Sequence, residues 1–286
     1  MRRHLLAIVA TLIGLVLTAD RPVPVEAASK AVIQEVTFET VGMSFKGPES
    51  VPAGLTLIQI VNKGTDFHHV QLIRLTDGKT AEDFAATVKT APFNPMGPAA
   101  APAWVHFIGG PNGAMPGESA TAVMNLEPGN YVLICFIPDS KGVAHAAQGM
   151  MKALKVTGAA NAGVSEPKAT INITAMDFKL VPDKAIAAGT QTIRFNNAGT
   201  QPHEVLVVQL PPDKTIKDFA AAFEPGHAGP PPGKPIAGMT GIEKGGHGFF
   251  TAKFEPGHYG LICFFMDGTK QAPHFALGMM QDFTVK

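Results

Sequence analysis

Residues 127–136 read EPGNYVLICF, and residues 255–264 read EPGHYGLICF. Each stretch places one of the chain's two tyrosines four residues before one of its two cysteines, so two uncommon residue types recur in register. From each tyrosine onward, Tyr131–Ile137 and Tyr259–Phe265 are almost continuously apolar. A short apolar run that follows a Pro-Gly turn predicts a strand buried in the middle of a sheet.

The similarity between the two halves of the chain extends beyond these stretches. Residues 61–75 (VNKGTDFHHVQLIRL) align with residues 196–210 (NNAGTQPHEVLVVQL), which places His68 on His203 at an offset of 135 positions. After the cysteines, HAAQGMM (145–151) aligns with HFALGMM (274–280). These matches indicate a tandem duplication. We expect a first domain at 30–157, a small polar linker at 158–167 and a second domain at 168–286.

The periodicity within each repeat is that of β-strands. Residues 55–61 and 190–195 alternate apolar and polar side chains, as half-buried strands do. One short helix per repeat is predicted, at Thr80–Val88 and Thr215–Phe223, because each segment opens with a threonine followed by a nearby acidic residue. Short strands, Gly and Pro turns and about 120 residues per repeat predict an all-β fold of two tandem β-sandwich domains.

The composition limits the class of protein. The 286 residues carry 23 Lys and Arg against 23 Asp and Glu, which gives a formal net charge of zero. Without a basic surplus to neutralise phosphates, no nucleic-acid partner is expected. Hydrophobic residues make up 45% of the chain, which is enough for substantial cores and excludes a disordered protein.

The first residues have the pattern of an export signal. Arg2 and Arg3 precede an apolar run from Leu5 to Leu17, and Val25-Glu26-Ala27 resembles a cleavage site. The run is shorter than the roughly 20 residues of a spanning helix, so a cleaved signal peptide at 1–27 is favoured over a membrane anchor. We therefore expect a secreted or periplasmic mature chain that begins near Ala28 and has no membrane span.

Four side chains that can bind a metal recur in both repeats. Two imidazoles, one thiolate and one thioether are the ligand set of a blue-copper centre, in which two His and one Cys form a plane and a distant Met is axial. The sulfur ligands stabilise Cu(I) while the imidazoles tolerate Cu(II), so one geometry can hold both redox states. The predicted copper ligands, one set per repeat, are His68, Cys135, His145 and Met150, and His203, Cys263, His274 and Met279.

These motifs resemble those of the cupredoxins, the plastocyanin/azurin family of blue-copper proteins. Residues 196–203 (NNAGTQPH) resemble the family segment that carries the first ligand, and Pro-Gly-x-Tyr-x-x-x-Cys followed by His and Met resembles the segment that carries the other three. The resemblance covers about residues 32–157 and 168–286. It implies Greek-key β-sandwiches, one copper per domain and outer-sphere electron transfer to an unidentified redox protein. The family also implies an exposed second histidine as the exit for the electron.

Two features depart from the family pattern. Nine residues (136–144) and ten residues (264–273) separate each cysteine from the second histidine, whereas familiar members have a much shorter spacing. The family often has an Asn after the first histidine that ties the ligand loops together, and here the corresponding residues are His69 and Glu204. The sequence therefore predicts less support around the ligands than is usual in the family.

Several other interpretations are compatible with these residues. A copper-free cupredoxin-like module could bind a protein or a small ligand, and a copper carrier could use the same soft ligands as a buffer. The two cysteines could instead form a disulfide. Met151 and Met280 also recur, as core residues or as spare soft ligands.

An enzyme is not expected from the sequence. Two-domain copper oxidases and nitrite reductases connect their electron-transfer copper to a catalytic centre through a histidine next to the cysteine. Here Ile134 and Phe136 flank the first cysteine, and Ile262 and Phe264 flank the second. Ligands for a second type of copper centre are not visible in the sequence.

Overall fold

The computed structural model describes residues 32–90, 101–139, 141–158, 163–223 and 230–286. The expected signal peptide at 1–27, the expected start near Ala28 and part of the expected linker lie outside the described residues. The described residues belong to one compact unit. The division into domains at 30–157 and 168–286 stays a prediction.

The described strands form two large sheets, and each sheet contains strands of both repeats. The eight-stranded sheet has the order β11-β10-β12-β15-β7-β4-β1-β2, and the nine-stranded sheet has the order β19-β16-β13-β14-β6-β5-β8-β9-β3. In both orders the strands of the second repeat come first and those of the first repeat follow. The fold is all-β, as the sequence predicts.

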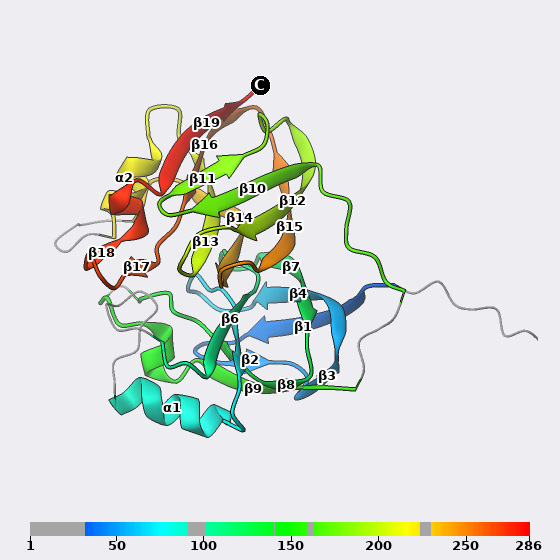
Figure 1. Ribbon diagram of the computed structural model, residues 1–286. Helices are drawn as coiled ribbons and strands as arrows, with labels where there is room; N and C mark the ends of the chain where they lie inside the picture. The colour runs from blue at the N-terminus through cyan, green and yellow to red at the C-terminus, as the bar shows by residue number, and fades with distance from the viewer. Residues whose placement is uncertain (1–31, 91–100, 140, 159–162, 224–229) are drawn as a thin grey trace, which may run out of the picture. The chain divides into compact units, whose positions relative to one another are not determined.

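The strands at the junction occupy corresponding places in the two repeats. β7 pairs with β15 through Val123 and Phe249, and β6 pairs with β14 through Ile108 and Ile242, both in the antiparallel direction. Figure 1 shows β7 and β15 side by side. Because equivalent strands pair with each other, the junction between the repeats resembles the interface of a symmetric dimer.

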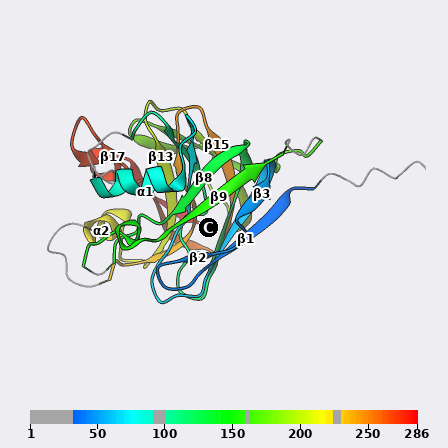
Figure 2. The same ribbon diagram turned by 90° about the horizontal axis from the view of Figure 1, so that it is seen from below.

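The strands of the first repeat come mainly from its alternating apolar segments. β1 pairs in parallel with β4, and β8 pairs with β9, which lies beside β3 in Figure 2. The bounds are β1 (Gln34–Thr40), β2 (Phe45–Lys46), β3 (Ser50–Pro52), β4 (Gly54–Asn62), β5 (Gln71–Leu75), β6 (Val105–Gly109), β7 (Ser119–Leu126), β8 (Gly129–Ile134) and β9 (Met151–Thr157).

The second repeat has a similar series of strands and adds a two-stranded pairing of β17 with β18. Its bounds are β10 (Ile171–Met176), β11 (Lys179–Pro182), β12 (Gly189–Asn197), β13 (His203–Leu210), β14 (Lys234–Ile242), β15 (His247–Phe254), β16 (Gly257–Ile262), β17 (Met266–Asp267), β18 (Ala272–Pro273) and β19 (Met280–Val285).

Among the described residues, each repeat has one α-helix, close to the place that the sequence predicts. The first, α1 (Ala81–Thr90), follows Thr80, and the second, α2 (Ile216–Ala221), follows Thr215. Thr215 and Asp218 form a capping box, in which each side chain accepts a hydrogen bond from the other's backbone N–H. Two short 3₁₀-helices that the sequence analysis did not predict, η1 (His145–Gln148) and η2 (His274–Leu277), lie after the cysteines.

The core lies between the sheets and is built from the buried faces of the alternating strands. The pattern predicted for residues 55–61 is present in β4, where Ile58 and Ile60 are fully buried. Tyr131 and Tyr259 are among the largest fully buried side chains, and their hydroxyls donate to the carbonyls of Glu127 and Glu255, both at 2.9 Å. These hydrogen bonds fix the turn that leads into each cysteine-bearing strand.

Candidate metal centres

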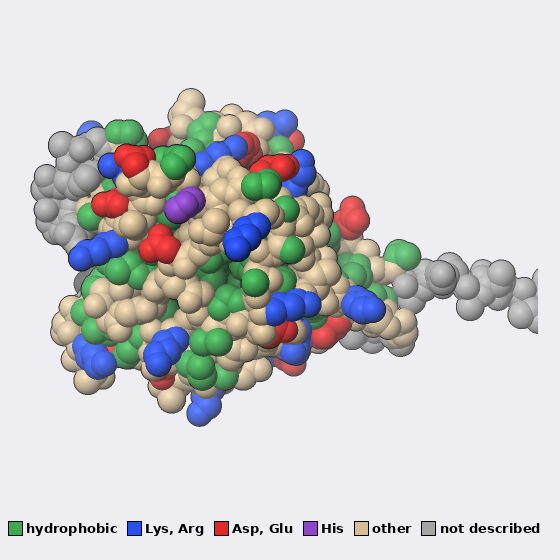
Figure 3. Space-filling model, turned by 90° about the horizontal axis from the view of Figure 1, so that it is seen from above, with side chains coloured by type: hydrophobic (Ala, Val, Ile, Leu, Met, Phe, Trp, Pro, Cys, Tyr) green, Lys and Arg blue, Asp and Glu red, His purple; other side chains and the backbone are tan. Residues whose placement is uncertain are grey.

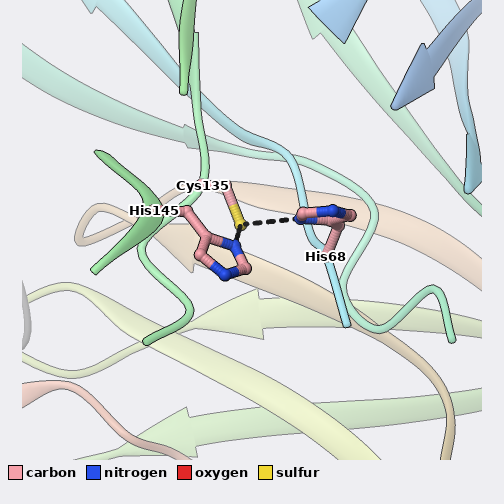
Figure 4. Close-up of side chains that lie close together, drawn as sticks. All are labelled: His68, Cys135 and His145. Carbon is pink, nitrogen blue, oxygen red and sulfur yellow. Dashed lines mark hydrogen bonds between the residues drawn. The ribbon is translucent and has the colours of Figure 1, made fainter. Parts of the chain in front are cut away.

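The first candidate centre joins three buried side chains from separate places in the first repeat. His68 lies between β4 and β5, Cys135 follows β8, and His145 begins η1. Cys135 Sγ lies 3.9 Å from His68 Nδ1 and 3.6 Å from His145 Nδ1. Figure 4 shows the sulfur between the two rings, with a ring nitrogen of each turned toward it.

The second candidate centre repeats this arrangement with His203, Cys263 and His274. Cys263 Sγ lies 3.5 Å from His274 Nδ1, and His274 Nδ1 lies 3.1 Å from His203 Nδ1. In each group the three ligand atoms lie within 4.8 Å of one another, and all six residues are buried. The structure therefore brings together the two His and one Cys that the sequence analysis assigns to each ligand set.

Backbone hydrogen bonds hold the later part of each group together. In the first repeat, Ala146 N–H donates to Cys135 O at 2.8 Å, Met150 N–H donates to His145 O at 3.0 Å, and Cys135 N–H donates to Met150 O at 3.3 Å. The second repeat has the same three hydrogen bonds, from Phe275 to Cys263, from Met279 to His274 and from Cys263 to Met279, at 2.9–3.1 Å. The long segments after the cysteines thus return to a fixed place.

Glycine permits the turn between the second histidine and the methionine. Gly149 and Gly278 end η1 and η2 with φ of 93° and 108°, a left-handed conformation that favours glycine. Met150 and Met279 follow directly and are fully buried. Their role as axial ligands stays a prediction, while Met151 and Met280 are the first residues of β9 and β19.

The second histidines are buried, so the expectation that they are exposed is wrong. His145 and His274 have relative exposures of 1% and 0%. The chain folds back after each cysteine, with His145 N–H donating to Ile137 O at 2.9 Å and His274 N–H to Phe265 O at 2.7 Å. The longer loops therefore take each imidazole inside the protein.

Burial keeps the ligand side chains neutral in the absence of a metal. Burial lowers the pKa of His68 to about 4 and that of His274 to about 4, so their imidazoles are neutral near pH 7. Burial raises the pKa of Cys135 to about 12 and that of Cys263 well above its usual value. A metal that binds here must therefore displace the thiol proton.

The two groups differ in what holds the far side of each imidazole. In the second repeat, His203 Nε2 lies 2.5 Å from Asp177 Oδ1, and His274 Nε2 lies 3.1 Å from Gln201 Oε1. In the first repeat, the Nε2 atoms of His68 and His145 are buried and have no hydrogen-bond partner among the described residues. The sequence analysis missed Asp177, which belongs to neither ligand motif.

The residues after the first histidines support the cysteine strands, which corrects the expectation of weak support. His69 Nε2 accepts a hydrogen bond from Phe136 N–H at 2.9 Å, and Glu204 Oε1 accepts one from Phe264 N–H at 3.0 Å. Each acceptor thus binds the amide that follows a cysteine. A different pair of side chains fills the place where the family often has Asn.

The donor sets fit copper better than a hard cation. Each group offers one sulfur and two imidazole nitrogens and contains no carboxylate. Soft sulfur and borderline imidazole ligands select copper or zinc over magnesium or calcium. Both cysteines are free, so the alternative of a disulfide between Cys135 and Cys263 is wrong. The two His/Cys/His groups could bind copper, one in each repeat.

No protein-family model and no curated relative matches the sequence. Solved structures do match it. Sodium-dithionite-reduced auracyanin from the photosynthetic bacterium Roseiflexus castenholzii is 25% identical, with 40% of this chain and 94% of that chain covered and a TM-score of 0.29. The two-sheet all-β architecture and its two His/Cys/His groups fit the cupredoxin-like fold expected from the sequence.

Two other matches span both repeats. A multicopper oxidase is 14% identical, with 88% of this chain and 88% of that chain covered and a TM-score of 0.24. A copper-containing nitrite reductase from Thermus scotoductus is 11% identical, with 89% of this chain and 62% of that chain covered and a TM-score of 0.24. Both matches are to enzymes and contradict the expectation that this chain is not an enzyme, which relied on the apolar neighbours of the cysteines.

Among the described residues, no helix combines the length and the apolar character needed to cross a bilayer. On the face shown in Figure 3, acidic and basic side chains are interspersed, in keeping with the zero net charge of the chain.

Proposed function

We propose that this cupredoxin-like protein binds one copper ion in each repeat and transfers single electrons. The observation that carries the proposal is the pair of buried His/Cys/His groups, each with its sulfur and one nitrogen of each imidazole within 4.8 Å of one another. Copper in such a group supplies a reversible one-electron couple.

The residues of the chain have distinct roles in this function. Cys135 and Cys263 would supply the thiolates, and the two histidines of each group would supply imidazole nitrogens. Met150 and Met279 would supply a thioether, because each buried methionine is joined by backbone hydrogen bonds to the cysteine and histidine of its own group. These hydrogen bonds keep the ligand positions fixed, which lowers the structural change that accompanies a change of charge.

Copper loading with visible absorption tests the function. The purified chain titrated with Cu(II) is expected to bind two equivalents and to develop a strong thiolate-to-copper band. The band should weaken as the pH falls, because the thiol and imidazoles must be free of protons to bind. A colourless protein with free thiols would instead favour the copper-free binding module.

Redox cycling separates an electron carrier from a copper carrier. Repeated reduction and reoxidation of the loaded protein should bleach and restore the band without release of copper to a chelator. Release of the metal in the reduced state would favour the role of a copper buffer.

The proposal includes export and an unidentified redox protein as partner. The charged start, the apolar run and the small residues before Ala28 support export. Mass spectrometry of the protein from its native host tests this, and the expected mass is that of a chain that begins near Ala28. An intact Met1 in the membrane fraction would contradict it.

A further inference from the structure

Three buried side chains lie between the two candidate metal centres. Glu204 and His69 each follow the first histidine of their own group in sequence, and Asn112 lies after β6 of the first repeat. Their relative exposures are 4%, 6% and 3%. All three side chains are therefore largely shielded from bulk solvent.

The two ends of this set contact the cysteine strands. In the first repeat, Phe136 N–H donates to His69 Nε2 at 2.9 Å, and Phe136 is bonded to Cys135. In the second repeat, Phe264 N–H donates to Glu204 Oε1 at 3.0 Å, and Phe264 is bonded to Cys263. The residue that follows each cysteine thus donates a backbone hydrogen bond to a buried side chain of the set.

Asn112 connects the two ends across the junction of the repeats. Its Nδ2 donates to Glu204 Oε2 at 3.3 Å and to Val205 O at 3.4 Å, both in the second repeat. On the other side, Val70 N–H donates to Pro111 O at 3.0 Å, and these two residues are bonded to His69 and Asn112. His69 Nδ1 has no hydrogen-bond partner among the described residues, so the backbone hydrogen bond makes this link.

We infer that His69, Asn112 and Glu204 form an internal path for electrons between the two metal groups. The inference rests on the proposed function, because it requires copper in both groups. One electron leaves the reduced group and enters the oxidised group of the other repeat. No covalent bond forms or breaks, and no external oxidant or reductant takes part.

The path is buried, and its hydrogen bonds hold its residues in fixed positions. The path joins the two cysteines through a few side chains, whereas the covalent chain between Cys135 and Cys263 passes through nearly all of the second repeat. The two centres together then store two electrons, and an electron that enters at one copper can move to the other.

The chain offers a matched control for Asn112. Thr240, in the second repeat, crosses the same junction in the opposite direction, with its Oγ1 donating to Val70 O at 3.0 Å. Its backbone N–H donates to Gly110 O, just as Asn112 N–H donates to Gly238 O. Thr240 is fully buried but makes no hydrogen bond to His69 or Glu204 in the described structure.

The test measures electron exchange between the two centres in Asn112→Leu and Thr240→Val. The single-site variants Cys135→Ser and Cys263→Ser first assign the visible band of each centre. A one-electron pulse into the fully loaded protein then partly bleaches both bands, and their redistribution is followed in time. In the parent protein and in Thr240→Val, we expect a phase whose rate does not depend on protein concentration.

In Asn112→Leu, we expect this phase to be lost, so that only concentration-dependent exchange between molecules remains. Copper stoichiometry and the positions of both bands should stay as in the parent, which shows that the centres themselves are intact. An unchanged phase in Asn112→Leu, or equal slowing in both variants, would overturn the inference.

A second variant keeps the test decisive if Asn112→Leu does not fold. Asn112→Ser keeps a small polar group but is too short to reach Glu204, and it should also lose the concentration-independent phase. If neither band develops in the parent protein, the proposed function fails and the path fails with it. Two normal bands without exchange in the parent would overturn the path alone.

Discussion

Asp177 Oδ1 lies 2.5 Å from Nε2 of His203, and the equivalent place in the first repeat is Gly42. The equivalence follows from strand pairing. Ala175, two residues before Asp177, pairs with Asn197, and Thr40, two residues before Gly42, pairs with Asn62. A carboxylate that binds the far nitrogen of a ligand imidazole orients the ring and makes it a better donor. The two repeats therefore hold their first histidines differently.

We predict that Asp177→Asn weakens copper binding at the second centre alone. Loss of such a supporting carboxylate costs about 10–100-fold in metal affinity. The affinity is measured by competition with a chelator, in a Cys135→Ser background that removes the first centre. Asp183→Asn is the matched control, because Asp183 is also hydrogen-bonded, to Asn172, away from the ligands. Equal affinities of the two variants would contradict the role of Asp177.

The two centres should be lost independently. All three His and Cys ligands of each group come from one repeat, so Cys135→Ser should abolish only the first centre and Cys263→Ser only the second. Serine is similar in size but is a poor substitute for a soft thiolate. Copper analysis and thiol counting on each variant should give one copper and one thiol. Loss of both centres from either change would refute independence.

The tyrosine hydroxyls should stabilise the fold without affecting copper. Tyr131→Phe removes one buried hydrogen bond, to Glu127 O, and should lower the free energy of unfolding by about 1 kcal/mol. Tyr259→Phe should cost more, because its hydroxyl also accepts a hydrogen bond from Glu255 N–H at 3.1 Å. Urea unfolding of the metal-free variants measures both values. An equal cost, or loss of copper binding, would show that the hydroxyls act differently.

The metal-free protein should lose stability as the pH falls below about 6.5. Burial lowers the pKa values of His68 and His274 to about 4 in the folded state, against 6.5 for an exposed histidine. Between these values the unfolded chain binds more protons than the folded chain, so acid favours unfolding. Below about pH 4 the contribution of these two histidines should be fully lost. Urea midpoints across this range provide the measurement.

Copper should suppress this acid sensitivity while it remains bound, because it stabilises the folded state. A midpoint of the metal-free protein that stays constant from pH 6.5 to pH 4 would contradict the burial of neutral imidazoles.

The sequence by itself was sufficient for the all-β class and for the His and Cys groups. Hydrophobic residues that recur at every second position indicate strands such as β4, because alternate side chains of a strand face the core. The order of the ligands along the chain, with a fixed step from His145 to Met150, is a local pattern that recurs in the second repeat. Local spacing is visible in a sequence, and two copies of it make the pattern specific.

Only the tertiary structure decided what surrounds the ligands. The burial of His145 and His274 depends on how the loops fold back, which their length alone does not determine. Asn112 reaches Glu204 across 92 positions of sequence because β6 pairs with β14, and the support of His203 by Asp177 depends on the pairing of β10 with β12. Contacts between residues far apart in the chain follow from strand pairing, and no short motif records them.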